Sequence, residues 1–264
     1  MAIIAASILD ADFGNLKYEI DRVVRAGVDM FTLDIMDGSF APRITFGDYV
    51  VACIRGWTDL PLEVHLMIEE PERSLENFLD SGVDLVVFHL EASKRHGDII
   101  SAVHERNRAV GMAVLATTPV ERVFDWVREL DVVNFLTVPV GFGGQKSAPD
   151  TIQRIKSLRQ FAKDVNPDLV IEVDGGIKPH NAAEHAAAGA DMLTVGTGIY
   201  HAPNAEEAVR QLREETAGTL DGLARQRGSA FLNRCPLSAE EKVRRDKHFR
   251  ELEKNLDVRL AIPS

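Results

Sequence analysis

Two short segments of this chain each place an aspartate at the end of an apolar run. The first reads Leu33-Asp34-Ile35-Met36-Asp37-Gly38, and the second reads Ile171-Glu172-Val173-Asp174-Gly175-Gly176. A buried carboxylate is costly unless it is paired, bound to a metal or used in catalysis. Asp34 and Asp174 are therefore the first candidates for a reactive centre, although for each a structural hydrogen bond is the alternative.

Two carboxylates that face each other across a small substrate suit a two-base proton exchange. One takes a proton from a carbon next to a carbonyl, and the other returns a proton to the opposite face. The result is epimerisation through an enediolate, which needs a metal or hydrogen-bond donors for stabilisation. His65 follows another apolar run, and with Asp34 and Asp174 it offers nitrogen and oxygen ligands for a divalent cation.

Three pairs of small residues follow late apolar runs and could bind a phosphate. They are Gly143-Gly144, Gly175-Gly176 and Gly196-Thr197. Bare backbone N–H groups in the late loops of a βα barrel commonly hold a phosphate. Each pair alone could equally form an ordinary tight turn, so the prediction rests on the three loops converging.

The elements that would position these residues alternate along the chain. Eight apolar runs are each followed by an amphipathic pattern, which includes a helix expected from Pro119 to Leu130. The runs are Ile3–Ser7, Met30–Met36, Val64–Met67, Leu85–His89, Met112–Leu115, Val132–Val138, Leu169–Val173 and Asp191–Val195. Buried runs without polar alternation are typical of parallel strands covered on both faces. Eight such units predict an α/β fold, a (β/α)8 TIM barrel, with a doubly wound open sheet as the alternative.

The barrel is predicted to span residues 1–218. Residues 219–264 form a C-terminal helical extension, with a capping box at Ser238 and a charged helix to about Asn255. We expect this extension to pack on the barrel or on a partner subunit; the alternative is a solvated tail.

Composition limits the possible partners. The net charge of -11 argues against nucleic acid as the main partner. The two cysteines do not suggest a disulfide framework, and no apolar run approaches the roughly 20 residues that span a bilayer. The first residues read as a strand and not as a signal peptide, so we expect a cytoplasmic protein without a membrane partner.

Taken together, these segments resemble the ribulose-phosphate 3-epimerase family. The matching segments, in family order from Ala2 to about Pro203, are Ser7-Ile8-Leu9-Asp10-Ala11-Asp12-Phe13, Asp34-Ile35-Met36-Asp37-Gly38, Val64-His65-Leu66-Met67, Gly141-Phe142-Gly143-Gly144-Gln145 and Glu172-Val173-Asp174-Gly175-Gly176. The resemblance implies a metal-dependent isomerase that inverts carbon 3 of a phosphorylated sugar. We also expect a homo-oligomer.

The resemblance also implies roles for single residues. Asp34 and Asp174 are the acid–base pair, and with His65 they bind a divalent cation such as Zn, Fe, Mn or Co. The substrate-binding residues are Ser7, His65, Met36 and Met67, with Gly143, Gly144, Gly175, Gly176, Gly196 and Thr197 at the phosphate.

The departures from the family pattern lie in the same region. Thr32 stands where the family has its first metal-binding histidine, and a hydroxyl is a poor ligand for zinc or iron. The sugar-facing segment reads Ser39-Phe40-Ala41-Pro42-Arg43 in place of the family's His-Phe-Val-Pro-Asn. The substrate is therefore predicted to be ribulose 5-phosphate/xylulose 5-phosphate or a related 6-phosphoketohexose or tetrulose phosphate. The alternatives are a noncatalytic sugar-phosphate-binding barrel that has lost its metal site, and another isomerase or lyase on the same scaffold.

Overall fold

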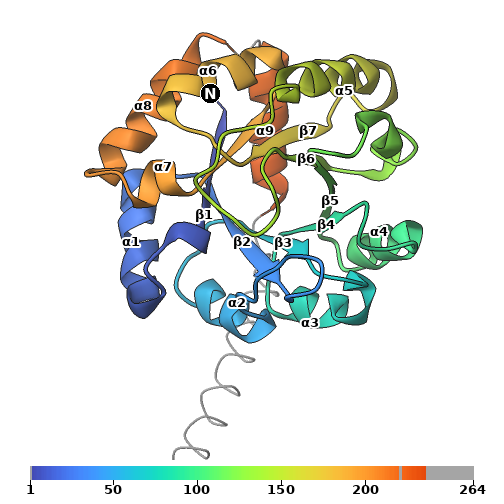
Figure 1. Ribbon diagram of the computed structural model, residues 1–264, viewed down its shortest axis with the longest axis horizontal. Helices are drawn as coiled ribbons and strands as arrows, with labels where there is room; N and C mark the ends of the chain where they lie inside the picture. Colours follow the sequence, from blue (N-terminus) through green and yellow to red (C-terminus); the bar gives the residue numbers. More distant parts are fainter. Residues whose placement is uncertain (1, 220–221, 236–264) are drawn as a thin grey trace, which may run out of the picture.

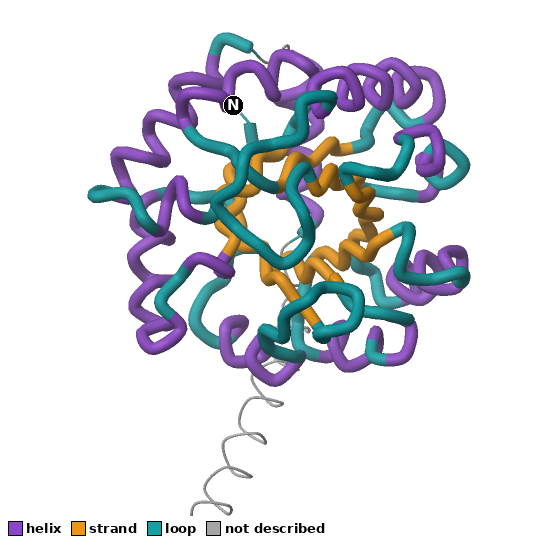
Figure 2. Tube along the Cα trace, viewed as in Figure 1, coloured by secondary structure: helices purple, strands orange, loops and turns teal. Residues whose placement is uncertain are grey.

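Eight parallel strands close into a barrel, and helices surround it (Figures 1 and 2). The computed structural model describes residues 2–219 and 222–235. The strands are β1 (Ile3–Ser7), β2 (Met30–Met36), β3 (Leu62–Met67), β4 (Leu85–His89), β5 (Ala109–Leu115), β6 (Val132–Leu136), β7 (Val170–Asp174) and β8 (Met192–Val195). Each strand pairs with the next in sequence, and β8 pairs with β1 through Ile3↔Met192. The predicted TIM barrel is confirmed.

The helices follow the strands in the expected alternation. They are α1 (Leu16–Ala26), α2 (Asp48–Arg55), α3 (Leu75–Asp80), α4 (His96–Glu105), α5 (Thr151–Val165), α6 (Pro179–Ala188), α7 (Thr197–Tyr200), α8 (Ala205–Ala217) and α9 (Gly222–Arg234). Short 3-10 turns η1 (Ile8–Asp10), η2 (Phe13–Asn15) and η3 (Pro71–Arg73) lie between them. None of the helices in the described residues is long and apolar enough to cross a membrane.

One predicted helix is wrong. The segment from Pro119 to Leu130 forms two short 3-10 turns, η4 (Val120–Val123) and η5 (Val127–Glu129). The buried anchors of this segment are β-branched valines, which favour the α-helix less than unbranched residues do. The predicted helix after Ser238 lies outside the described residues.

Inside the barrel, side chains form layers because alternate residues of a strand point to the same face. The lowest layer is apolar and includes Met30, Leu85 and Val170. Above it lies a layer with buried polar groups, which we call the polar layer; its members are Thr32, Glu63, Asn134, Glu172 and Thr194. The next positions along the same strands carry the candidate reactive residues, so the barrel holds these residues directly above the polar layer.

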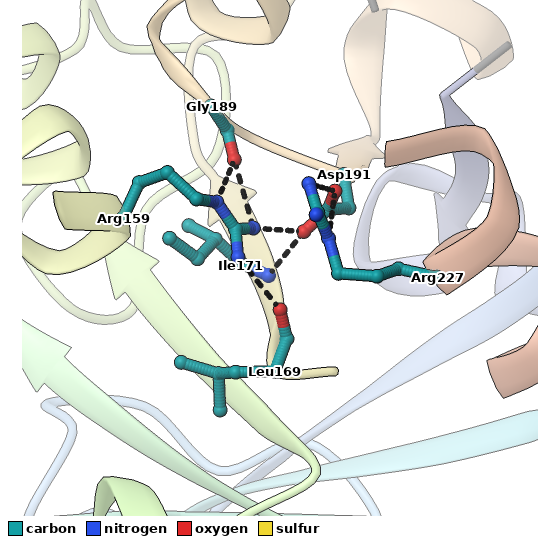
Figure 3. A network of polar contacts seen from close by, with 6 residues as sticks. All are labelled: Arg159, Leu169, Ile171, Gly189, Asp191 and Arg227. Carbon is teal, nitrogen blue, oxygen red and sulfur yellow. Dashed lines mark hydrogen bonds and ion pairs between the residues drawn. The ribbon is translucent and has the colours of Figure 1, made fainter. Parts of the chain in front are cut away.

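Helix α9 packs against the apolar end of the barrel. Phe231, which is 1% exposed, belongs to the same cluster as Met30 and Leu85. Arg227 of α9 and Arg159 of α5 both bind the carboxylate of Asp191, just before β8 (Figure 3). The described part of the C-terminal segment is thus tied to the barrel by apolar contacts and by a buried ion-pair cluster.

Candidate active site

Asp34, His65 and Asp174 meet at the carboxyl end of the barrel. Asp34 and His65 are directly paired across β2 and β3, and Asp174 is the last residue of β7. Nδ1 of His65 lies 3.4 Å from Oδ1 of Asp34 and 3.3 Å from Oδ2 of Asp174. The three side chains are buried, and their ligand atoms all lie within 4.8 Å of one another. One imidazole nitrogen thus faces two carboxylates, a donor set that suits a divalent cation.

The charges of this triad shift the pKa values of its members. Burial alone would lower the pKa of His65, but the facing carboxylates of Asp174 and Asp34 raise it well above the usual value. Burial raises the pKa of Asp174, with a further rise from the Asp34 charge and an opposing effect of His65. The carboxylates therefore favour positive charge on the imidazole, and a metal ion at this position would supply that positive charge instead.

Further contacts fix the orientation of Asp34. The Ser7 hydroxyl donates a 2.7 Å hydrogen bond to Oδ2 of Asp34. Thr45 donates to the backbone carbonyl of Asp34 at 2.6 Å and accepts from the backbone N–H of Met36 at 3.0 Å. Ser7 therefore lies beside the candidate catalytic carboxylate, and Thr45 holds the end of β2.

A second histidine, His89, stands behind His65; it was a candidate as a polar residue at a predicted strand end, but no role in the site was assigned to it. The two rings stack with centroids 5.0 Å apart, and Nε2 of His65 lies 3.0 Å from Nε2 of His89. Nδ1 of His89 lies 3.4 Å from Oε2 of Glu91. Burial lowers the pKa of His89 to about 4, so the ring is neutral at pH 7. We call Glu91, His89 and His65 the histidine relay. Within it, His89 contacts His65 on the side opposite to the two aspartates.

Thr32 lies one layer below the triad. It is fully buried, its hydroxyl has no hydrogen-bond partner among the described residues, and it pairs in register with Glu63. Burial, then the charge of Glu172, raises the pKa of Glu63 well above its usual value. Burial thus favours the neutral form of Glu63 in the polar layer, to which Thr32 also belongs.

A pocket opens above the triad. The predicted residues that line it are Ser7, Asp34, Met36, Met67, Gly143, Gly144, Asp174, Gly175, Gly176, Gly196 and Thr197. Of the predicted residues, His65 alone is outside this lining, because it is fully buried between the two aspartates. Leu136 and Val138 join Met36 and Met67 in a buried apolar cluster that forms one wall.

The three predicted phosphate-binding pairs converge on this pocket, but the two glycines of one pair also serve packing. Gly175 and Gly176 have φ values of 106° and 72°. A Cβ on Gly176 would meet the backbone of Gln145 and Ser147 at 2.6 and 2.8 Å. This pair is therefore needed to let the loop after β6 lie against the end of β7, whatever the ligand.

Asp10 also lines the pocket, and it too was not among the predicted site residues. It lies at the end of η1 and points its carboxylate among the glycines of the late loops. A Cβ on Gly143 would lie 2.9 Å from Oδ1 of Asp10, and one on Gly196 would collide with Oδ2. In the sequence, Asp10 stands shortly after the first strand and within the first segment that resembles the family.

Comparisons with known proteins agree with this geometry. A family model described as the ribulose-phosphate 3 epimerase family matches residues 3–200. The chain is 40% identical to a ribulose-phosphate 3-epimerase of Bacillus subtilis over 217 residues, which cover 81% of this chain and 99% of the relative. It is 38% identical to that of Schizosaccharomyces pombe, with 80% and 92% covered.

Among solved structures, 3-hexulose-6-phosphate synthase from Salmonella typhimurium aligns with a TM-score of 0.61 at 18% identity, covering 82% of this chain and 99% of the other. At that identity the likeness concerns the fold. The family match and the two relatives decide the assignment: the chain belongs to the ribulose-phosphate 3-epimerase family, isomerases that act on carbohydrates.

Proposed function

We propose that this protein inverts carbon 3 of a ketose phosphate by proton transfer between Asp34 and Asp174. The observation that carries the proposal is the convergence of both carboxylates on one nitrogen of His65, at the base of a pocket. The relatives named as ribulose-phosphate 3-epimerases favour ribulose 5-phosphate and xylulose 5-phosphate over the hexulose and tetrulose phosphates.

In this proposal one aspartate removes the proton from carbon 3, and the other protonates the opposite face of the planar enediolate. Ser7 donates the 2.7 Å hydrogen bond to Asp34 and so fixes the orientation of this base. The apolar wall of Met36, Met67 and Leu136 keeps water from the reacting carbon. These residues orient the bases and protect the intermediate.

Asp34, His65 and Asp174 would hold the divalent cation, and when bound it would polarise the ketone and stabilise the negative oxygen. Two observations support the fit: the donor atoms lie within 4.8 Å of one another, and Nδ1 of His65 faces both carboxylates at 3.4 and 3.3 Å. Thr32 lies in the layer beneath and supplies no ligand nitrogen. His89 does not replace the missing histidine, because its ring contacts Nε2 of His65 on the other side.

Other predictions remain as proposals. These are the division into a barrel of residues 1–218 and an extension of residues 219–264, the homo-oligomeric state and the cytoplasmic location. A noncatalytic sugar-phosphate-binding protein is the competing function, and the test below separates the two.

Asp174→Asn tests the mechanism. We expect inversion of ribulose 5-phosphate to fall at least about 100-fold, since general acid–base groups typically contribute that much or more. The assay follows both the epimer ratio and incorporation of deuterium from solvent at carbon 3 by NMR. The exposed Asp168→Asn is the matched control, because it makes the same chemical change away from the pocket. Full activity of Asp174→Asn would remove Asp174 from the mechanism, and no exchange by the wild type at any added metal would favour the noncatalytic function.

A further inference from the structure

Two loops from different strands meet at the rim of the pocket. The loop after β6 carries Phe142, which lines the pocket and is 43% exposed, and the loop after β2 carries Arg43. The loop after β6 extends over the mouth of the barrel towards the loop after β2 (Figures 1 and 2). The guanidinium carbon of Arg43 lies 4.6 Å from the centre of the Phe142 ring. A cation over an aromatic face is attracted by the ring, so this contact joins the two loops.

The backbones of the two loops also approach each other closely. Gly141 has a φ value of 93°, and a Cβ at this position would lie 3.2 Å from Cδ of Pro42. Glycine therefore allows the loop after β6 to adopt this conformation and to pass beside Pro42. The next residue of each loop is then Phe142 or Arg43, so the close approach brings the ring and the guanidinium together.

The loop after β2 is the fixed side of this contact. Oδ1 of Asp37 accepts two backbone N–H groups of this loop at 2.8 and 2.9 Å, and Oδ2 accepts the backbone N–H of Glu69 at 2.8 Å. An antiparallel bridge between Asp37 and Ile44 closes the loop. Phe142 lies near the middle of a longer connection, which runs from residue 137 to residue 150. Arg43 thus extends from an anchored loop and holds a ring on a longer one.

We propose that Arg43 is a positioning residue: it holds Phe142 at the entrance of the pocket and so slows the release of a bound sugar phosphate. A ligand at Asp34 and Asp174, at the base of the pocket, has to pass this rim. The asparagine of the family pattern at position 43 is uncharged and cannot make a cation–π contact, so the device belongs to this chain. The inference rests on the proposed function in taking ribulose 5-phosphate as ligand, whereas the contact between the loops does not depend on turnover.

Arg43→Ala tests the proposal through the separate responses of KM and kcat. An exposed cation–π contact typically changes an equilibrium about two- to fivefold. We therefore expect KM for D-ribulose 5-phosphate to rise by about that factor, while kcat changes by less than about twofold. Arg43→Lys keeps a cation and is expected to restore part of the loss. The matched control is Arg73→Ala, since Arg73 is exposed after β3 and pairs with Glu70 at 2.8 Å; its KM is expected to equal that of wild type.

Phe142→Leu separates the contact from a direct attraction between Arg43 and an anionic sugar phosphate. Leucine keeps an apolar side chain but has no aromatic face, so Arg43→Ala is expected to have no further effect on KM in the Phe142→Leu background. The same two- to fivefold effect of Arg43→Ala in both backgrounds would overturn the proposal, as would a wild-type KM in Arg43→Ala alone.

The contact itself can be measured without a ligand. The ring current of Phe142 is expected to shift the NMR signals of the Arg43 side chain upfield, and Phe142→Leu is expected to remove that shift. Identical Arg43 signals in the two proteins would overturn the proposal. If no protein turns over the sugar, the proposed function fails, but the NMR comparison still decides whether Arg43 holds Phe142.

Discussion

Glu91→Gln is expected to weaken metal binding although Glu91 touches none of the three ligand side chains. A cation on the aspartate side of His65 takes the lone pair of Nδ1, so the ring hydrogen must be on Nε2. That hydrogen points at Nε2 of His89, 3.0 Å away, which must accept it. His89 then carries its own hydrogen on Nδ1, and this atom faces the Glu91 carboxylate at 3.4 Å. The histidine relay therefore sets the tautomer of His65 that binds a metal.

Glutamine reverses the relay because of a second contact of Glu91. Oε1 of Glu91 accepts the backbone N–H of Leu115 at 3.1 Å. The amide oxygen of glutamine keeps this acceptor role, so the NH2 group is directed at Nδ1 of His89. His89 must then carry its hydrogen on Nε2, and two N–H groups oppose each other between the rings.

The expected effect follows from the bond that is lost. A hydrogen bond to a charged group contributes about 1.5–3 kcal/mol, and about 1.4 kcal/mol corresponds to a factor of ten. We therefore expect the affinity for Co²⁺ to fall about 10- to 100-fold, as measured by competition with a fluorescent chelator. Glu105→Gln, exposed at the end of α4, is the control. An affinity within about threefold of wild type would refute the relay.

Two further predictions concern the barrel itself. Asp84→Ala removes the carboxylate that lies 2.9 Å from the buried Arg55 guanidinium, so the free energy of unfolding in urea is expected to fall by about 3–5 kcal/mol. The control, Asp80→Ala, removes an exposed partner of Arg106 and is expected to lower it by less than about 1 kcal/mol. Similar losses in the two variants would contradict the importance of burial. Burial and the Asp174 charge raise the pKa of Glu172 to about 8. Between the unfolded value of about 4.3 and this folded value the native state binds the extra proton, so wild-type stability falls as pH rises, by up to about 1.4 kcal/mol per unit. Glu172→Gln has no titrating group at this position, so its free energy of unfolding relative to wild type is expected to rise from pH 5 to pH 8 in chelator-treated protein. A difference that stays constant with pH would show that Glu172 is ionised throughout this range.

The fold could be predicted from the sequence because each strand is an uninterrupted apolar run. Both faces of a barrel strand are covered, so the runs from Ile3 to Ser7 and from Met30 to Met36 match β1 and β2. The short 3-10 turns after β5 could not be predicted in the same way. Three buried valines at near-helical spacing look like a helix in the sequence, and only packing decides between the two.

The site was partly predictable for the same reason. Parallel strands of a barrel end at one mouth, which brings Asp34, His65 and Asp174 together without any knowledge of distances. His89 ends the strand next to His65, so the pairing of the two rings could have been inferred from the order of the strands. Asp10 could not, because its contact with Gly196 depends on closure between β1 and β8 and on the direction of a short turn.

The position of Thr32 explains how the triad keeps its geometry without the histidine of the family pattern. Asp34 is fixed by Ser7 and by Thr45, and His65 is fixed from behind by His89. None of these contacts involves Thr32, which lies in the polar layer beneath. Three protein ligands with an open position are also what a catalytic metal site requires, since the substrate must bind there. A change at position 32 is therefore expected to affect metal binding while it leaves the placement of Asp34, His65 and Asp174 unchanged.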